Sequence, residues 1–214
     1  GKSVLLRALE KDLGPENALN IADVAVDPTK PLIDTVGKTL EEGLELLSLV
    51  GLNDAFLFLR RYDQLSDGQK YRYRLAKLIE SGKPYWFADE MCATLDRDTA
   101  KIVAFNVQKL ARRYGRAVMA ATTHTDLFND LKPNVHIHKG LGKEIKVQYY
   151  PNEATRDCSL AKDMVIVEGT KRDWLELEPW HYRQGKIPPV LKIYVLKRGE
   201  ETAGVIVYSY PGVI

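Results

Sequence analysis

Two adjacent acids, Asp89 and Glu90, follow directly after the short apolar run Tyr85–Ala88. A carboxylate at the end of a buried strand can bind Mg²⁺, and a second one beside it can hold and deprotonate a water molecule. Two ionised carboxylates this close repel each other, so a bound cation would stabilise the pair. The residue types and their spacing therefore predict a metal-assisted hydrolytic site. The alternative is a solvated strand end without chemistry.

The chain begins with Gly1-Lys2-Ser3, ahead of a helical pattern. These are the last three positions of the phosphate-loop pattern G-x-x-x-x-G-K-[ST]. In that pattern backbone N–H groups cradle phosphates, the lysine neutralises the terminal phosphate and the hydroxyl binds Mg²⁺. Three residues alone occur often by chance, but a strand ending in Asp downstream supplies the second Mg²⁺ contact of such sites. Gly1, Lys2 and Ser3 are therefore predicted to bind a nucleotide, with Ser3 and Asp89 as metal ligands.

Alternating helices and strands must position these residues. Apolar periodicity and breakers predict an α/β domain with a largely parallel sheet over residues 1–150. In the first helix the period places Val4, Leu5, Ala8 and Leu9 on one face. The predicted helices are 2–12, Thr39–Leu49, Gly68–Glu80 and Arg97–Tyr114, and the predicted strands are 19–26, 85–88 and 116–122.

The pattern changes after Pro133. Residues 134–150 alternate with period 2 around the turn Gly140-Leu141-Gly142, which predicts a hairpin whose His136 and His138 point outward as polar residues. Residues 151–162 are polar and irregular and are interpreted as a linker. Residues 163–214 then predict a strand, a helix and a second hairpin.

Composition excludes several classes of protein. The 214 residues are 45% hydrophobic and 28% charged with a net charge of +2, typical of a globular protein, so affinity for nucleic acid is neither indicated nor excluded. Cys92 and Cys158 are too few for a disulfide framework or a metal cluster and are expected to be small apolar residues in a reducing compartment. No apolar run is long enough to span a membrane and no signal peptide is recognisable, so we expect a cytoplasmic protein.

At this point several motifs together match a known family. Leu65-Ser66-Asp67-Gly68-Gln69 resembles the signature of ABC ATPases, usually L-S-G-G-Q, and opens a basic helix as it does there. Asp89-Glu90 followed by Ala93-Thr94-Leu95-Asp96 resembles the Walker B strand and D-loop. Met119–Leu127 resembles the strand that ends in the switch histidine, here His124. Order and rough spacing agree, so residues 1–150 resemble an ABC-type ATPase domain of the P-loop NTPase fold.

The resemblance implies ATP and Mg²⁺ as cofactors and a role for each matching residue. Glu90 would act on the attacking water, and His124 would hydrogen-bond the γ-phosphate or that water. Asp96 of the D-loop would contact the nucleotide. Ser66, Gly68 and Gln69 lie at a helix N-terminus, a ready anion site, and would bind the γ-phosphate held by a second copy of the chain. The expected partner is thus a second copy, in a head-to-tail dimer formed on ATP.

Two positions depart from the family. Asp67 replaces the usual glycine of the signature and is expected to cap its own helix. The glutamine of the Q-loop is missing after the strand predicted at 19–26, where Asp27-Pro28-Thr29-Lys30-Pro31 stands. Asp27 is interpreted as a partial replacement that contacts Mg²⁺ or water. In transporters the Q-loop couples nucleotide to the membrane partner, so its absence counts against transport.

The C-terminal residues 163–214 resemble the first half of a GNAT acetyltransferase domain, a partial α+β module. The acetyl-CoA loop of that fold follows its fourth strand, which lies beyond these residues. Acetyl-CoA would therefore be a cofactor only of a full-length protein that includes that loop. No residue of this chain is assigned to acetyl transfer.

Two functions remain open from the sequence. The first is an ATP-hydrolysing, non-transport ABC ATPase fused to an acetyltransferase-like module, favoured by the C-terminal resemblance and the missing Q-loop glutamine. The alternative is the nucleotide-binding subunit of an ABC transporter that energises a separate membrane permease. A module that binds ATP without turnover is disfavoured because Glu90 and His124 are both present.

Overall fold

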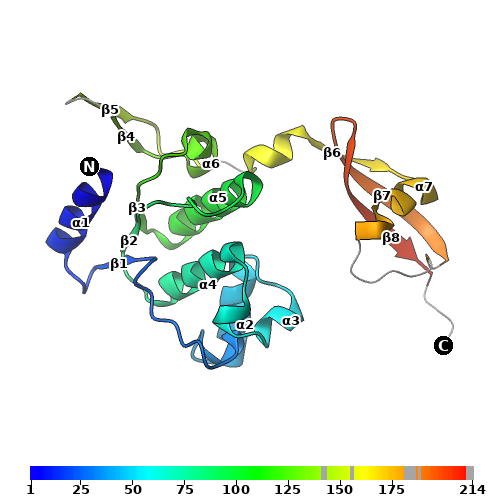
Figure 1. The fold of residues 1–214 in the computed structure, drawn as a ribbon, viewed down its shortest axis with the longest axis horizontal. Coiled ribbons are helices and arrows are strands. Elements are labelled where there is room, and N and C mark those ends of the chain that lie inside the picture. The colour runs from blue at the N-terminus through cyan, green and yellow to red at the C-terminus, as the bar shows by residue number, and fades with distance from the viewer. Residues whose placement is uncertain (141–143, 155–156, 181–186, 188, 211–214) are drawn as a thin grey trace. The chain divides into compact units, whose positions relative to one another are not determined.

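The computed structural model of the chain describes residues 1–140, 144–154, 157–180, 187 and 189–210. The chain divides into two compact units, Gly1–Ser159 and Leu160–Ile214. Figure 1 labels their helices and strands. None of the described helices is both long enough and apolar enough to cross a membrane.

The first unit is built on a parallel sheet of three strands in the order β1-β2-β3. The central strand pairs with both neighbours, so that Phe87 lies between Asn20 and Met119. The strands are β1 (Ala18–Asn20), β2 (Tyr85–Ala88) and β3 (Ala117–Ala120). The parallel sheet confirms the predicted mixed α/β class.

Strand β1 is much shorter than the predicted strand 19–26. The Asn20 side chain accepts a hydrogen bond from the N–H of Ala22 at 3.1 Å, and the Asn20 carbonyl accepts one from Asp23 at 3.0 Å. This local turn draws the chain out of the sheet. The apolar residues Ile21 and Val24 are buried in the core without strand pairing, which the apolar pattern could not distinguish from a strand.

Helices cover both faces of the sheet (Figure 1). Trp86 and Ala88 of β2 belong to the main core, which α4 (Asp67–Glu80) and α5 (Arg97–Tyr114) enclose. Phe87 points to the opposite face and packs with Leu6 of α1 (Lys2–Leu13). Side chains of successive strand residues alternate between faces, so a four-residue strand can serve two helical layers.

The apolar face that the period identifies on α1 is not the face that packs against the sheet. Leu6 is the buried residue of this helix, whereas Val4, Leu5 and Leu9 are 69%, 48% and 40% exposed. The periodicity identified the helix itself correctly but gave the wrong apolar positions to the sheet. One leucine at the contact with Phe87 decides which side of the helix is covered.

The other helices of this unit are α2 (Leu40–Leu49), α3 (Ala55–Phe58) and α6 (Phe128–Leu131). Thr39 caps α2 by accepting a hydrogen bond from the N–H of Glu42, and Gly115 ends α5 in the left-handed conformation with φ of 63°. Neither α3 nor α6 is predicted from the sequence. A helix of four residues is too short to show an apolar period.

The hairpin of β4 (Val135–Lys139) and β5 (Ile145–Tyr149) forms as predicted, with its turn residues 141–143 outside the described part of the chain. His136 is predicted to point outward from this hairpin, but it packs against a neighbouring helix. The His136 ring lies 5.2 Å from the ring of Phe128 in α6, while Ile137 and Val147, a cross-strand pair, are about half exposed. The aromatic contact with α6 therefore decides which face turns inward.

The second unit contains β6 (Met164–Glu168), α7 (Lys171–Leu177), β7 (Val190–Arg198) and β8 (Glu201–Ser209). Its sheet is antiparallel in the order β6-β7-β8. Ile193 and Val195 of the central strand are buried. Gly169, after β6, lies so close to this strand that a Cβ atom there would meet Val195 at 2.2 Å, which makes glycine necessary.

Removing the hydroxyl group from each of two tyrosines of α4 is expected to change the free energy of unfolding in opposite directions. The Tyr71 hydroxyl oxygen is buried without a hydrogen-bond partner among the described residues, and burial raises the pKa of Tyr71 far above its usual value. The Tyr73 hydroxyl lies 2.7 Å from that of Thr35. We expect Tyr71→Phe to raise the free energy of unfolding by about 1 kcal/mol and Tyr73→Phe to lower it by about the same amount.

Urea denaturation followed by circular dichroism measures both changes, with each variant serving as the control for the other. A Tyr71→Phe protein less stable than the parent would contradict the prediction, because it would mean that the hydroxyl has a bonding partner such as a buried water.

Candidate active site

Strand β2 ends directly before the two acids. Asp89 is half-buried and Glu90 is exposed, and the Glu90 N–H donates to Asp89 Oδ1 at 3.1 Å. Glu90 has a positive φ of 49°, and Cys92 one of 60°. Residues other than glycine rarely adopt this conformation, and it occurs most often where the surrounding structure imposes it at functional sites. The turn at Glu90 therefore ends the strand, in which successive side chains point to opposite faces of the sheet.

Hydrogen bonds to the end of β3 hold the loop after Glu90. The Met91 N–H donates to the Ala121 carbonyl at 2.8 Å, and the Thr122 hydroxyl donates to the Met91 carbonyl at 3.3 Å. The His124 N–H in turn donates to the Thr122 hydroxyl at 3.1 Å. The segment carrying His124 is thus joined to the loop that carries Glu90, and the half-buried His124 belongs to the same region of the fold.

The buried Cys92 lies in this loop as a free thiol, and burial raises its pKa to about 12. A thiol with so high a pKa stays protonated at neutral pH and is a poor nucleophile. This agrees with the predicted role of Cys92 as a small apolar residue. Cys158 is half-buried.

Ser66, not Asp67, caps α4, so the predicted capping role of Asp67 is wrong. Ser66 Oγ accepts from the Gln69 N–H at 3.3 Å, and the Gln69 side chain accepts from the Ser66 N–H at 3.0 Å. This capping box uses Ser66 because its extended backbone lies one residue before the helix, while Asp67 is already in the first turn. The N–H groups of Asp67 and Gly68 remain without partners inside the helix.

Gly68 is needed where α4 approaches α5. A Cβ atom at this position would lie 2.9 Å from the methyl carbon of Thr99. Thr99 also donates its N–H to Asp96 Oδ1 at 2.9 Å, which makes Asp96 the N-cap of α5. Hydrogen bonding from Thr99 lowers the pKa of the Asp96 carboxyl below its usual value. The first turns of α4 and α5 therefore lie close together, with Thr99 of α5 next to Gly68 of α4.

The first residues of α1 lie apart from these contacts. Gly1 is the N-cap without a side-chain hydrogen bond, Lys2 is exposed and Ser3 is half-buried. Within the described part of the chain, no hydrogen bond or ion pair joins them to Asp89 or His124. The N–H groups at the start of α1 are available to an anion.

The donors suit magnesium. Mg²⁺ prefers one or two carboxylates together with water and phosphate oxygens. Asp89 Oδ1 accepts the N–H of Glu90, which leaves Oδ2 for a metal. No cluster of three or more histidine, cysteine or acidic side chains that could hold a metal by itself occurs among the residues described. The described end of β2 therefore offers one carboxylate oxygen, Asp89 Oδ2, to such a metal.

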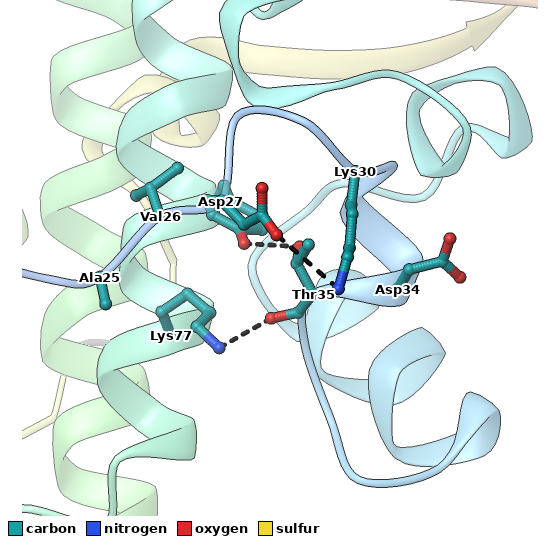
Figure 2. Close-up of a pocket in the computed structure, with 8 residues that line it drawn as sticks. Ala25, Val26, Asp27, Lys30, Asp34, Thr35 and Lys77 are labelled. Carbon is teal, nitrogen blue, oxygen red and sulfur yellow. Dashed lines mark hydrogen bonds and ion pairs between the residues drawn. The ribbon is translucent and has the colours of Figure 1, made fainter.

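Asp27 lines a pocket of about 360 Å³ (Figure 2). Its lining does not include Asp89, Glu90 or His124, and the sequence did not predict this pocket. The Asp27 carboxylate accepts from the Thr29 N–H at 2.9 Å and from the Thr29 hydroxyl at 2.6 Å, and these bonds lower its pKa. Lys30 lies 3.8 Å away as an ion pair. The pocket is lined by Ala25, Val26, Asp27, Lys30, Asp34, Thr35, Tyr73 and Lys77.

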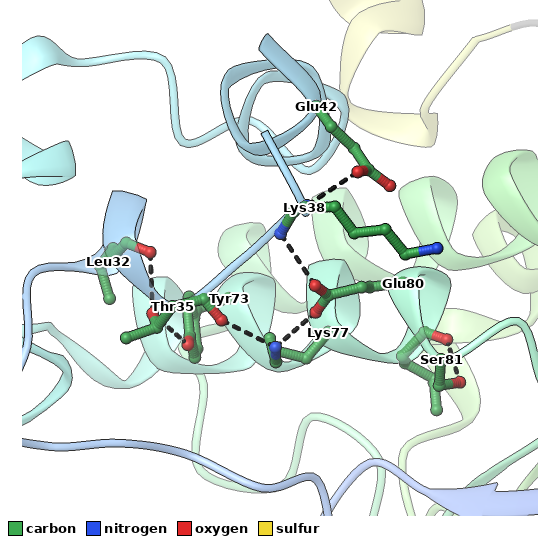
Figure 3. Close-up of polar contacts among 10 residues, drawn as sticks. Leu32, Thr35, Lys38, Glu42, Tyr73, Lys77, Glu80 and Ser81 are labelled. Carbon is green, nitrogen blue, oxygen red and sulfur yellow. Dashed lines mark hydrogen bonds and ion pairs between the residues drawn. The ribbon is translucent and has the colours of Figure 1, made fainter. Parts of the chain in front are cut away.

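A polar network adjoins this pocket through Thr35 and Lys77, which also line the pocket (Figure 3). Lys77 donates to the Thr35 carbonyl at 2.7 Å and forms a close ion pair with Glu80, whose other oxygen accepts from the Gly37 N–H at 2.8 Å. Thr35 donates its hydroxyl to the Leu32 carbonyl at 2.8 Å. The network ties residues 32–37 to α4, and no signal in the sequence pairs Lys77 with Thr35.

No protein-family model matches the chain. It is 37% identical over 91 residues to the cytochrome c biogenesis ATP-binding export protein CcmA of Paracoccus denitrificans, covering 42% of this chain and 40% of that protein. It is 29% identical over 136 residues to CcmA of Bartonella henselae, covering 64% of each. It is 33% identical over 101 residues to a methionine import ATP-binding protein of Rhodococcus jostii, covering 47% of this chain and 29% of that one.

Solved structures are also similar. A dimeric structure of MJ0796, described as a bacterial ABC transporter cassette, superposes with a TM-score of 0.49 at 19% identity, covering 61% of this chain and 73% of that one. The chain covers less than two thirds of each curated relative named above. The matched relatives support the ATPase part of the chain, and none of the relatives or solved structures named above supports a GNAT-like module. Over part of its length the chain is therefore similar in sequence to ATP-binding proteins of ABC transporters.

Proposed function

We propose that the first unit binds and hydrolyses ATP. The observation that supports this most directly is the linked geometry of the two acids and the histidine. Hydrogen bonds at Met91 and Thr122 join the loop of Asp89 and Glu90 to the segment of His124. The curated relatives are ATP-binding proteins by name, which supports the choice of nucleotide.

Each residue has a distinct role in this proposal. Lys2 and the N–H groups at the start of α1 bind the phosphates, and Ser3 and Asp89 hold Mg²⁺. The metal, when bound, neutralises charge on the phosphate oxygens. Glu90, exposed to solvent, orients the attacking water and accepts its proton. His124 donates a hydrogen bond to the γ-phosphate.

Mg²⁺-dependent ATP binding tests the proposal. A version of the protein with a complete phosphate-loop sequence ahead of Gly1 is expected to bind Mg-ATP, because that loop adds the N–H cradle to Lys2 and Ser3. Isothermal calorimetry with and without Mg²⁺ measures the affinity. Asp89→Asn is expected to weaken the Mg²⁺-dependent part of the binding. Equal affinity with and without the metal would contradict the assignment of Ser3 and Asp89.

We propose further that two copies enclose ATP between them. The start of α4 is exposed at Ser66, and no described contact joins it to the start of α1. A second copy would bring its α4 N-terminus, with Gly68 and Gln69, to the γ-phosphate held by the first. Such an interface is two-fold and uses the same surface on both copies.

Light scattering tests the dimer. The Glu90→Gln variant, which is expected to keep ATP bound, should double its mass at saturating Mg-ATP and return to a monomer when ATP is removed. Ser66→Asp serves as the matched variant and should stay monomeric, because an aspartate can still cap α4 while its carboxylate repels the partner's γ-phosphate without touching Asp89 or Glu90. A monomer at saturating ATP would overturn the dimer.

The process that ATP drives is proposed from the relatives. Their names describe an export protein and an import protein, which favours a role as the nucleotide-binding subunit of a transporter whose membrane permease is a separate chain. A permease gene beside this one would support that role, and the absence of any permease among its physical partners would count against it.

One observation favours the second candidate, an ATPase fused to an acetyltransferase-like module. The second unit runs strand, helix, strand, strand, with an antiparallel sheet in the order β6-β7-β8, as the sequence resemblance to the start of a GNAT domain implies. Calorimetry with acetyl-CoA on the full-length gene product tests this candidate, and no binding would remove its support.

A further inference from the structure

We propose that Arg97 and Asp126 form a positioning pair that fixes His124 relative to the loop carrying Glu90 and Asp96. The inference rests on the proposed ATP hydrolysis and adds two residues to it. Neither side chain is assigned a contact with nucleotide. Both act through the residues beside them.

The pair is bidentate. Arg97 Nε donates to Asp126 Oδ2 at 3.0 Å, and Arg97 Nη2 donates to Asp126 Oδ1 at 2.5 Å. The Arg97 hydrogen bond lowers the pKa of the Asp126 carboxyl, so the carboxylate stays ionised at neutral pH. Two parallel bonds fix the orientation of both groups, which a single lysine contact could not do.

The pair joins two segments that are far apart in sequence. Arg97 is the first residue of α5 and follows Asp96, the N-cap of that helix. Asp126 lies in the short 3-10 helix Thr125–Leu127, two residues after His124. Leu127 is fully buried, and its contact with the core fixes the rotation of this short helix about its axis.

His124 is therefore held from both directions. Before it, the Thr122 hydroxyl bonds the Met91 carbonyl at 3.3 Å. After it, Asp126 bonds Arg97. Met91 lies in the loop between β2 and α5, and Arg97 is the first residue of α5 after that loop, so the two connections together set the position of His124 against Glu90.

A surface ion pair without a positioning role would give a different result when it is removed by mutation. The two side chains are 38% and 42% exposed, and pairs this exposed contribute little to stability. A pair that only stabilises the fold would therefore change neither stability nor rate strongly. A positioning pair changes the rate far more than the stability, because a displacement of about 1 Å at a reacting group can cost about 100-fold.

The experiment uses the protein with a complete phosphate loop and compares Arg97→Ala, Arg97→Lys, Asp126→Ala and the double variant Arg97→Ala/Asp126→Ala. We expect each single variant to lower kcat by about 10- to 100-fold. The KM for ATP should change by less than about twofold, because nucleotide binding is untouched. The double variant should be no slower than either single one, since both remove the same connection. Lys192→Ala, from the exposed pair with Glu168 in the second unit, is the matched control and should keep the parent rate.

Parent kcat in the single variants would overturn the inference, as would losses that multiply in the double variant or that match the loss of folded protein in thermal melts. Arg97→Lys at the parent rate would show that charge alone suffices, which also overturns a role for the bidentate geometry. Failure of the proposed function is distinguishable. If the parent and Glu90→Gln show equal turnover, ATP hydrolysis at this site and the inference both fail. If only Glu90→Gln is slow, the inference alone fails.

Discussion

Replacing Glu90 by Gln is expected to lower ATP turnover by about 10²–10⁴-fold while Mg-ATP binding persists. The substitution keeps the size of the side chain and removes the group that accepts the proton of the attacking water. The side chain is exposed at the end of β2, where a water can reach it. Single-turnover and steady-state assays, on protein with a complete phosphate loop, measure the loss.

The backbone at Glu90 makes glutamine the appropriate replacement. Its φ of 49° lies in the left-handed region, and Gln meets the same steric demand as Glu. Glu90→Gly would also remove the base, but it would relax the backbone and move the loop. A slow Glu90→Gln protein therefore reports on the carboxylate, whereas a slow Glu90→Gly protein alone would not.

Asp89→Asn separates the two acids. This variant is expected to lose Mg²⁺-dependent affinity, because the half-buried Asp89 carboxylate is the proposed metal ligand. Glu90→Gln should retain it. If Glu90→Gln hydrolysed ATP at the parent rate, the catalytic assignment would be wrong, and the two acids would be a metal-binding strand end only.

The sequence could predict elements whose signals are local. Helices α4 and α5 both carry long apolar periods, and the structure confirms both helices within a residue, although the cap of α4 is Ser66 and not the predicted Asp67. Strand β2 was found because Tyr85–Ala88 is apolar and bounded by Pro84 and Asp89. The acids at its end followed from the same boundary.

Contacts between distant segments could not be predicted from periodicity. The choice between the two faces of the β4–β5 hairpin rests on the ring of Phe128 against His136, and the covered side of α1 rests on Leu6 against Phe87. The Arg97–Asp126 pair spans 29 positions. A single sequence holds no signal for such pairs, because each residue alone reads as an ordinary surface charge or an ordinary apolar residue.

Trp86→Ala is expected to lower the free energy of unfolding by about 3–5 kcal/mol. Trp86 is 1% exposed in the main core, and its indole N–H donates to the Lys83 carbonyl at 3.0 Å. The substitution removes the largest fully buried side chain of the first unit and leaves a cavity between the sheet and its helices. It also leaves the Lys83 carbonyl without its donor, which adds to the loss.

Trp180→Ala is the matched control, because Trp180 is 86% exposed in the second unit. Removing an exposed side chain changes stability by no more than about 0.5 kcal/mol. Urea denaturation followed by circular dichroism measures both variants, and an unchanged slope against urea shows that the midpoints report stability. Trp86→Phe should lie between the parent and Trp86→Ala, since it fills part of the cavity.

The loss at Trp86 should reach the candidate site. Trp86 lies three residues before Asp89 in the strand that ends at the two acids, and its partner residues Leu19 and Val118 hold that strand in register. Trp86→Ala protein that is still folded at low temperature should therefore bind Mg-ATP more weakly than Trp180→Ala protein. Equal stability of the two variants would contradict the prediction and would mean that the core between β2 and the helices α4 and α5 closes over the cavity at little cost.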